Sequence, residues 1–263
     1  MNFTKIICTI GPAVNKYETL VELIQLGMNV ARLNFSHGTY DQHKQTIQWL
    51  KQARESCQTS LSIMLDTKGP EIRVGTLKKG LLDLNKGDEL LIVSDDKEGN
   101  EKQIPISPLS VTKNLTINTP ILFDDGYLLS KVIAITEQGI MIKIEEGGRL
   151  KSGKGVNIPG VKLDLPALTQ RDIEDIIFAC KQDVDIIAAS FIRSSEHVLT
   201  IKRLLNAHQK SNTLVFSKIE NNEGLNNFDT ILSVTDGIMI ARGDLGVELP
   251  LSTIPKLQKM MIK

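Results

Sequence analysis

The chain has 263 residues, and its 31 basic residues balance its 31 acidic residues to a net charge of zero. This balance argues against nucleic acid or an anionic membrane surface as a partner, because both attract strongly basic proteins. Aromatic residues make up only 4% of the chain, which is few for a protein that stacks on single-stranded bases. The length is enough for one large domain or two smaller ones.

The cysteines and the apolar runs bear on the cellular compartment. Cys8, Cys57 and Cys180 are far apart in the chain, which fits reduced thiols better than a disulfide framework or a zinc site. No apolar run reaches the length of a membrane span, and the first residues lack the apolar core of a signal peptide. We therefore expect a soluble, cytoplasmic protein with no membrane partner.

The first part of the chain alternates short strands with amphipathic helices. Strands are predicted at residues 5–10, 28–33 and 61–65. Asn15 and Glu18 have the spacing of a capping box, which predicts a helix that begins there and ends at Gly27. A second helix is predicted over residues 41–54. Such alternation is typical of a parallel sheet covered by helices.

Between about residues 70 and 165 the pattern changes to short strands separated by turn residues. Hairpins are predicted around residues 85–88, 124–126 and 137–139. The segment is interpreted as a small all-β domain inserted after the third strand. Its glycine-rich exit, residues 153–160, has the composition of a hinge.

The strand–helix alternation resumes after Pro166. Strands are predicted at 184–190, 214–217 and 237–241, with helices that begin at Thr169 and Ser195 and a last one over 255–262. We expect an α/β protein with a (β/α)8 TIM-type barrel, formed by residues 1–68 and 166–263 around an inserted all-β domain at 69–165. The barrel is expected to be incomplete, with about six βα units, because a closed barrel takes roughly 250 residues.

Polar and charged residues gather directly after the predicted strands: Arg32, Asn34, Ser36, Asp66, Thr67, Lys68, Lys218, Glu220, Arg242 and Asp244. In a (β/α) barrel the loops after the strands meet at one rim, so these side chains are expected to lie close together. Lys218 and Glu220 are two positions apart, and in a strand they point to the same face. With Asp244 they would form a hard-cation site beside a fixed positive charge, which suits phosphoryl transfer. A buried structural ion pair is the alternative.

The residues after the second and third strands predict anion and cation binding. Arg32 suits a bidentate phosphate contact, and the oxygens of Asn34, Ser36 and Asp66 resemble a cage for a cation. Taken singly, Asn34 and Ser36 are also ordinary turn formers, and Asp66 with Thr67 is compatible with a turn. Their occurrence together at one rim favours a site.

The chain resembles the pyruvate kinase family from Thr4 to about Lys263. The segments that carry the resemblance are residues 4–12, 32–38, 66–73, 154–157, 217–221 and 241–246. The resemblance implies a glycolytic phosphotransferase that moves a phosphoryl group from phosphoenolpyruvate to ADP, and it implies pyruvate and ATP as products.

The resemblance also implies roles for individual residues. By this resemblance, the catalytic residues are Lys218 and Arg32. The residues that contact phosphoenolpyruvate are Arg32, Lys218, Gly243 and Asp244. The residues that contact the nucleotide are Asn34, Phe35, Ser36, His37, Arg73 and Lys154. The ligands of Mg²⁺ (or Mn²⁺) are Glu220 and Asp244, and those of K⁺ are Asn34, Ser36, Asp66 and Thr67. Glu71 is the residue that in this family accompanies potassium dependence.

Members of the family continue past the sixth strand with two more βα units and a C-terminal domain, and they form homotetramers. This difference leaves two further interpretations of the chain. One is a non-catalytic remnant that binds phosphoenolpyruvate, a nucleotide or a full-length partner. The other is a different barrel enzyme, such as a metal-dependent aldolase. Lys154 and the inserted β domain argue against the aldolase, because the resemblance gives them the role of covering a nucleotide, which an aldolase does not use.

Some polar residues carry no predicted chemistry. His43, His197 and His208 fall on predicted helices and are expected to be solvated. Asp124, Asp125 and the glycine that follows them are expected to form a hairpin turn despite their two carboxylates.

Overall fold

A computed structural model of the chain describes residues 4–263. The chain divides into two compact units. One unit holds the chain up to Gly69, Ala167–Ile219 and Asn227–Ile240. The other holds Pro70–Pro166, Glu220–Asn226 and Ala241–Lys263.

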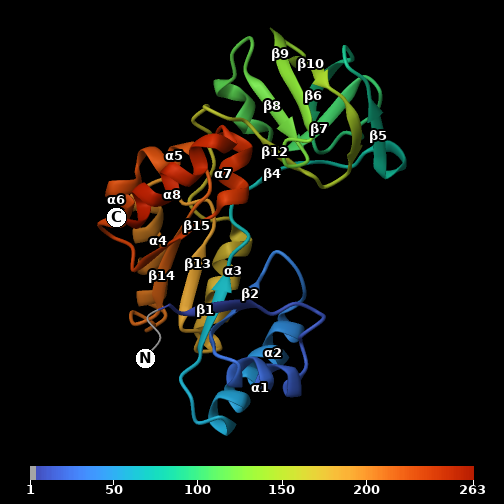
Figure 1. Ribbon diagram of the computed structural model, residues 1–263. Helices are drawn as coiled ribbons and strands as arrows, with labels where there is room; N and C mark the ends of the chain where they lie inside the picture. The colour runs from blue at the N-terminus through green and yellow to red at the C-terminus, as the bar shows by residue number, and fades with distance from the viewer. Residues whose placement is uncertain (1–3) are drawn as a thin grey trace. The chain divides into compact units, whose positions relative to one another are not determined.

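The first unit is built on a six-stranded parallel sheet. Its strands are β1 (Ile6–Thr9), β2 (Met28–Asn34), β3 (Ser62–Asp66), β13 (Ile186–Ala189), β14 (Leu214–Ile219) and β15 (Gly237–Ile240). They lie in chain order, and each pairs in parallel with the next. Figure 1 draws β1 and β2 of this sheet in blue and β13, β14 and β15 in yellow to orange-red. This is the predicted incomplete (β/α)8 barrel, with an all-β segment inserted after its third strand.

Amphipathic helices connect these strands. They are α1 (Tyr17–Gln25), α2 (Tyr40–Ser56), α3 (Gln170–Lys181), α4 (Ser195–Ala207) and the short α6 (Phe228–Leu232). Helix α1 packs on α2 and β2, and α4 packs on β14. The buried stripe of α2 includes Ile47 and Leu50, both fully buried as their helical spacing predicts. Burying each such side chain contributes roughly 1.5–3 kcal/mol.

The helix starts predicted at Thr169 and Ser195 are confirmed. Thr169 caps α3 in a capping box with Asp172, and α4 begins at Ser195. The capping box predicted at Asn15 and Glu18 is wrong, because α1 begins at Tyr17 after a residue that makes no side-chain cap. The Asn15 side chain instead accepts a hydrogen bond of 2.9 Å from the Thr46 hydroxyl on α2. A tertiary contact has replaced the local one.

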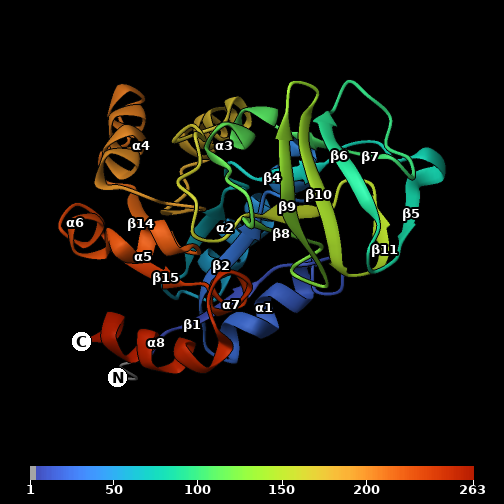
Figure 2. The ribbon, with the colours of Figure 1, turned by 90° about the horizontal axis from the view of Figure 1, so that it is seen from above.

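The second unit contains a closed barrel of seven strands. Its members are β4 (Ile72–Val74), β6 (Glu89–Ser94), β7 (Gln103–Ser107), β8 (Pro120–Phe123), β9 (Leu128–Thr136), β10 (Gly139–Glu146) and β12 (Gly155–Asn157). The order around the barrel is β10-β6-β7-β4-β12-β8-β9, and β6 and β7 are parallel whereas the other pairs are antiparallel. Strands β5 (Leu81–Leu84) and β11 (Gly148–Lys151) form a separate two-stranded ribbon, which Figure 2 shows beside β6.

The hairpin predicted around residues 85–88 is wrong. A turn exists there, since the Asp88 N–H donates to the Asn85 carbonyl at 3.1 Å, but the strands on its two sides do not pair with each other. Strand β5 pairs with β11, and β6 pairs with β10 and β7. The other two hairpins are confirmed, as β8 pairs with β9 and β9 with β10. At the first of these turns Asp124 and Asp125 both have positive φ, as a tight hairpin turn requires.

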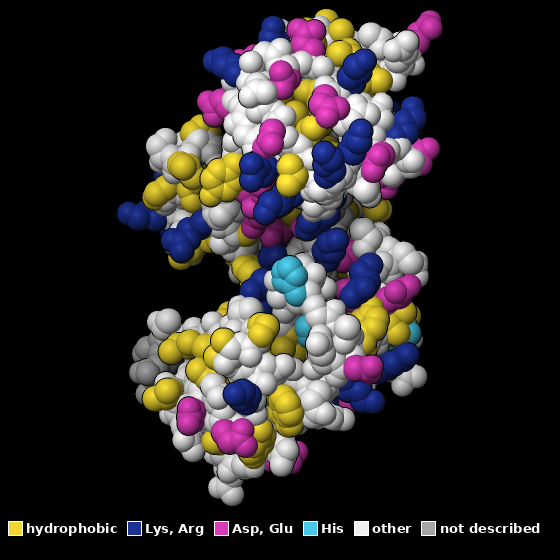
Figure 3. All heavy atoms as spheres, turned by 90° about the vertical axis from the view of Figure 1, so that its right-hand side faces the viewer, with side chains coloured by type: hydrophobic (Ala, Val, Ile, Leu, Met, Phe, Trp, Pro, Cys, Tyr) yellow, Lys and Arg dark blue, Asp and Glu magenta, His cyan; other side chains and the backbone are white. Residues whose placement is uncertain are grey.

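The remaining helices of the second unit are short. They are α5 (Asn222–Asn226), α7 (Arg242–Glu248), α8 (Ile254–Ile262) and the 3₁₀ turns η1 (Lys78–Gly80), η2 (Leu109–Asn114) and η3 (Leu251–Thr253). Within residues 4–263, no helix combines the length and the apolar character that crossing a bilayer would require. On the face drawn in Figure 3, basic and acidic side chains are interspersed, in keeping with the balanced net charge.

Candidate functional site

The carboxyl ends of four neighbouring strands bring polar side chains together in the first unit. Register pairs Asn34 at the end of β2 with Asp66 at the end of β3, and Asp66 with Ala188 on β13. Strand β14 follows, and Lys218 lies one residue before its end. Because the sheet is parallel, the ends of these strands share one edge, which is where sequence analysis expected a site.

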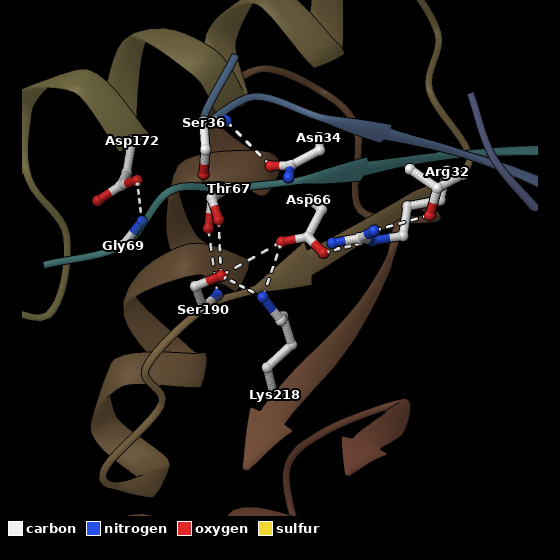
Figure 4. Close-up of polar contacts among 10 residues, drawn as sticks. Arg32, Asn34, Ser36, Asp66, Thr67, Gly69, Asp172, Ser190 and Lys218 are labelled. Carbon is white, nitrogen blue, oxygen red and sulfur yellow. Dashed lines mark hydrogen bonds and ion pairs between the residues drawn. The ribbon is translucent and has the colours of Figure 1, made fainter. Parts of the chain in front are cut away.

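Asp66 is the centre of this arrangement. Its Oδ2 accepts a hydrogen bond of 2.6 Å from Arg32 Nε, and its Oδ1 accepts one of 3.0 Å from Lys218 Nζ (Figure 4). Asp66 is 1% exposed, so the carboxylate is removed from water and held by two cations. Arg32 also donates from Nη1 to the Thr9 hydroxyl at 2.7 Å. The predicted substrate-binding cations are thereby fixed on one buried anion.

Ser190 is a member of the site that sequence analysis did not select. It follows β13, is 5% exposed, and its hydroxyl accepts a hydrogen bond of 2.7 Å from Lys218 Nζ. The same hydroxyl oxygen lies 2.6 Å from the Thr67 carbonyl and 3.2 Å from Asp66 Oδ1 (Figure 4). A serine after a strand is unremarkable in sequence. Ser190 ends the fourth predicted strand, and the ends of the barrel strands share one rim. This position is the feature of the sequence that could have identified it as a site residue.

The loop after β3 is held by a second carboxylate. Asp172, which is fully buried on α3, accepts from the Gly69 N–H at 2.8 Å with one oxygen and caps its own helix through Thr169 with the other. Gly69 has a φ of +73°, and a Cβ there would lie 2.8 Å from side-chain atoms of Ser190 and Phe191. Close packing against the loop after β13 therefore requires glycine at this position.

The segment after β2 turns sharply at the same edge. The Ser36 N–H donates to Asn34 Oδ1 at 3.0 Å, so the asparagine side chain shapes the turn. Phe35 is buried, and its ring stacks on His43 with centroids 3.9 Å apart. His37 is exposed, and its carbonyl lies 2.8 Å from His43 Nε2. Of the predicted nucleotide contacts in this segment, Phe35 thus has its side chain in the core.

A cavity of about 420 Å³ lies beside this turn, within the first unit. Among the residues that line it are Thr9, Gly11, Pro12, Asn34, His37 and Gln42. The lining combines backbone and side-chain polar groups with apolar surface, which is typical of small-molecule sites. Two predicted nucleotide-binding residues, Asn34 and His37, border the cavity.

The predicted nucleotide-binding cations of the second unit are paired within that unit. Arg73 donates to Glu71 Oε2 at 2.6 Å and to the Gly153 carbonyl at 2.6 Å. Lys154 Nζ lies 2.7 Å from Asp124 Oδ1 in the hairpin turn between β8 and β9. The hydrogen bond and the charge of Asp124 raise the pKa of Lys154, so the ammonium is fully charged at neutral pH.

The predicted divalent-metal ligands also belong to the second unit. Glu220 directly follows β14 and is buried, and Asp244 is exposed in the first turn of α7, next to Gly243. Among the described residues, 4–263, no three or more His, Cys, Asp or Glu side chains form a group that could hold a metal ion. A pair of carboxylates is a different case, because Mg²⁺ commonly takes one or two carboxylates and fills its other positions with water and substrate oxygens.

The expectation that the helical histidines are solvated is wrong for two of them. His43 is half-buried against Phe35, and burial lowers its pKa. His197 is also half-buried, its Nδ1 has no hydrogen-bond partner among the described residues, and burial together with the charge of Arg193 lowers its pKa to about 4. His208 is exposed as expected. Helical position alone does not reveal that neighbouring elements cover a side chain.

Comparison with known proteins gives the same family over the whole chain. The family model for the barrel domain of pyruvate kinase matches residues 1–263. The pyruvate kinase of Geobacillus stearothermophilus is 44% identical over 262 residues, which cover 99% of this chain and 45% of that protein. That of Bacillus licheniformis is 43% identical over 265 residues, which cover 100% of this chain and 45% of that protein.

The same holds for a third relative. The pyruvate kinase of Staphylococcus haemolyticus (strain JCSC1435) is 44% identical over 265 residues, which cover 100% of this chain and 45% of that protein. The chain spans less than half the length of each of these relatives. With the family model matched from end to end, and with the barrel strands and inserted β barrel in place, the chain belongs to the pyruvate kinase family.

Proposed function

We propose that the chain carries a phosphoryl-transfer centre in which phosphoenolpyruvate donates its phosphoryl group to ADP, giving pyruvate and ATP. The observation that carries the proposal is that one buried carboxylate, Asp66, fixes both Arg32 and Lys218 at neighbouring strand ends. Phosphoryl transfer depends mostly on positioning and on neutralising charge. Two cations fixed in advance meet both needs without reorganisation during the reaction.

Arg32 and Lys218 have different roles in this proposal. Arg32 uses Nε and Nη1 for Asp66 and Thr9, which orients the planar guanidinium for a phosphate oxygen of the substrate. Lys218 presents a compact ammonium, which stabilises charge on the phosphoryl group as it leaves the enol oxygen. Gly243 and Asp244 contribute backbone N–H groups for the substrate carboxylate.

The proposed cation ligands are all oxygen donors. Asn34, Ser36, Asp66 and Thr67 would hold K⁺. Asn34 and Asp66 pair in register at the ends of β2 and β3, and Ser36 and Thr67 follow these two strands. The Glu220 and Asp244 carboxylates would hold Mg²⁺ or Mn²⁺, which suits the preference of these ions for hard ligands. When bound, the cations supply positive charge that offsets the repulsion between the substrate and the nucleotide phosphates.

The residues proposed to contact ADP in the first unit are Asn34, Phe35, Ser36 and His37, of which Asn34 and His37 border the cavity. Arg73 and Lys154 are the proposed nucleotide contacts of the second unit. The cavity volume, about 420 Å³, is within the range of small-molecule sites. In this proposal residues 69–165 act as a lid domain, and residues 1–68 and 166–263 form the barrel part.

A second candidate, a module that binds ligands without turnover, is favoured by the open sheet. The sheet ends at β1 and β15, and Ile6 and Ile7 on β1 are 49% and 45% exposed. Relatives of more than twice the length carry further chain beyond the part matched here. Such a module would retain affinity for phosphoenolpyruvate or ADP, or would associate with a longer relative.

A lactate-dehydrogenase-coupled assay of the chain, with and without K⁺, separates the two candidates. The kinase predicts turnover that Lys218→Met lowers by orders of magnitude, while calorimetric binding of phosphoenolpyruvate is largely kept. The control is Lys202→Met, which removes a lysine from an ion pair with Asp236 and should leave turnover unchanged. Binding without turnover supports the second candidate. Failure to bind either substrate contradicts the kinase and also a module that binds these ligands, and it leaves only association with a longer relative, which co-purification with a full-length relative would test.

A further inference from the structure

Ser190 joins the ammonium of Lys218 to the loop after β3. Its hydroxyl oxygen lies 2.7 Å from Lys218 Nζ, 2.6 Å from the Thr67 carbonyl oxygen and 3.2 Å from Asp66 Oδ1 (Figure 4). The residue is 5% exposed, so water does not compete freely for these contacts. One small side chain thus touches three residues of the proposed site.

The chemistry of the groups fixes the direction of these hydrogen bonds. An ammonium donates and cannot accept, so the Ser190 oxygen accepts from Lys218. The single hydroxyl proton then points to another oxygen, and the Thr67 carbonyl at 2.6 Å is closer than Asp66 Oδ1 at 3.2 Å. Donation therefore runs from Lys218 through Ser190 to Thr67. Hydrogen bonds that run in one direction polarise and strengthen one another.

The backbone holds Ser190 in place for this contact. Its own N–H donates to the Thr67 hydroxyl at 3.2 Å, so Ser190 is tied to Thr67 twice. The next residue, Phe191, has a positive φ of 54°, and Gly69 packs against both of them. A left-handed non-glycine residue persists only where its surroundings enforce it. The hydroxyl thus has a defined position.

We propose that Ser190 is a positioning residue that couples Lys218 to the carbonyl oxygen of Thr67, beside the oxygens assigned to the monovalent cation. A cation that binds these oxygens competes with the Ser190 hydroxyl proton for the Thr67 oxygen. The altered Ser190 hydroxyl then changes the hydrogen bond that it accepts from the Lys218 ammonium. The role in phosphoryl transfer rests on the proposed function. The coupling itself concerns contacts within the first unit and can be tested without turnover.

The test is nuclear magnetic resonance of the whole chain with ¹⁵N-labelled lysine. The Lys218 ammonium signal is assigned by its loss in Lys218→Arg. Removing one hydrogen bond from a buried ammonium should speed exchange of its protons with water by about tenfold in Ser190→Ala. Ser190→Thr keeps the hydroxyl and should keep slow exchange.

Ser217→Ala is the matched control. Ser217 is fully buried beside Lys218 in the chain, but its hydroxyl is paired with Thr235 at 2.8 Å. This variant should leave the Lys218 ammonium signal unchanged. Equal exchange rates in Ser190→Ala and the unmodified chain would overturn the coupling, and so would an equal effect of Ser217→Ala.

Titration with K⁺ tests the link to the cation. The coupling predicts that K⁺ shifts the Lys218 signal in the unmodified chain and in Ser190→Thr, and that the shift is at least halved in Ser190→Ala. An undiminished shift in Ser190→Ala overturns the proposal. If Ser190→Ala does not fold, Ser190→Cys replaces it, because a thiol is a weak acceptor.

The two proposals fail in different ways. Loss of phosphoenolpyruvate binding, measured by calorimetry, would count against the kinase but would leave the ammonium result standing. If the Lys218 ammonium signal is the same in Ser190→Ala and in the unmodified chain, the coupling is contradicted, and the result of the kinase assay is unaffected.

Discussion

Lys218 donates a hydrogen bond of 3.0 Å to Asp66, although the two residues are 152 positions apart in the chain. Arg32 approaches the other oxygen of the same carboxylate at 2.6 Å. Two positive charges therefore share one negative charge that is 1% exposed. Removing the carboxylate would leave both cations without their common anion in a poorly solvated place.

Asp66→Asn should lower the free energy of unfolding by about 3 kcal/mol, because breaking a buried ion pair leaves an uncompensated charge. The change keeps the size of the side chain, so packing contributes little. The measurement is urea-induced unfolding followed by circular dichroism.

The control for this variant is Asp183→Asn. Asp183 pairs with Lys210 at the surface, where the side chain is 65% exposed, and its positive φ suits asparagine. Exposed pairs contribute little, so the unfolding midpoint of this variant should hardly move. Equal midpoints for the two variants would contradict the central role assigned to Asp66.

Gly69→Ala should destabilise the loop that carries Thr67. The new methyl group would lie 2.8 Å from the side chains of Ser190 and Phe191, and the residue has a φ of +73°. Overpacking and the left-handed backbone together should cost at least about 2 kcal/mol in the free energy of unfolding. Chemical denaturation measures this cost.

Gly27→Ala separates the two causes. Gly27 has a φ of +105°, and a Cβ there would meet nothing within 4 Å, so this variant carries backbone strain without the clash. It should be the milder of the two. A Gly69→Ala chain as stable as Gly27→Ala would show that the contact with the loop after β13 is not tight.

The six strands of the parallel sheet could be predicted because each is a short apolar run that ends in polar residues. The same pattern predicted that Arg32, Asp66 and Lys218 lie at one edge, and the structure joins these three directly. Local information was enough because parallel βα units repeat one simple geometry.

Features that depend on distant partners could not be predicted in this way. Strand β5 pairs with β11, more than sixty residues later, and not with its neighbour β6. Ser190 acquires its role from Lys218 and Thr67, which are 28 and 123 positions away. The Asn15 side chain accepts a hydrogen bond from Thr46 and does not cap the helix that follows it. In each case a tertiary contact outweighs the local signal.

His197 should make the chain less stable in acid. Its pKa is about 4 in the folded chain against an ordinary value of 6.5, because burial and the charge of Arg193 oppose protonation. Between these values the unfolded chain binds a proton that the folded chain refuses, so stability falls as pH falls.

His197→Gln should lose less stability than the unmodified chain between pH 7 and pH 5. The full linkage over this interval is about 2 kcal/mol, and solvent screening of a half-exposed ring reduces it to roughly 1 kcal/mol. Urea unfolding at the two pH values gives the difference. His208→Gln, at an exposed position, serves as the control and should track the unmodified chain.

Tyr40 should be a phenol that resists ionisation. Its hydroxyl donates to the buried carboxylate of Asp175 at 2.7 Å, and burial together with that carboxylate raises the pKa of Tyr40 from 10 to about 12. The other oxygen of Asp175 has no hydrogen-bond partner among the described residues, and burial raises the pKa of this carboxyl group. Arg171 contacts both groups, by an ion pair to Asp175 and over the ring of Tyr40.

An alkaline titration followed by tyrosinate absorbance tests this assignment in a chain with three tyrosines. The unmodified chain should show a component near pH 12 that Tyr40→Phe removes and that Asp175→Asn moves toward 10, since the amide lacks the negative charge that opposes the phenolate. Between pH 10 and 12 the unfolded chain releases a proton that the folded chain keeps, so stability falls as pH rises, and less so in Tyr40→Phe. A titration curve for Tyr40→Phe that still contains the late component would place the resistant phenol elsewhere and would undo the Tyr40–Asp175 assignment.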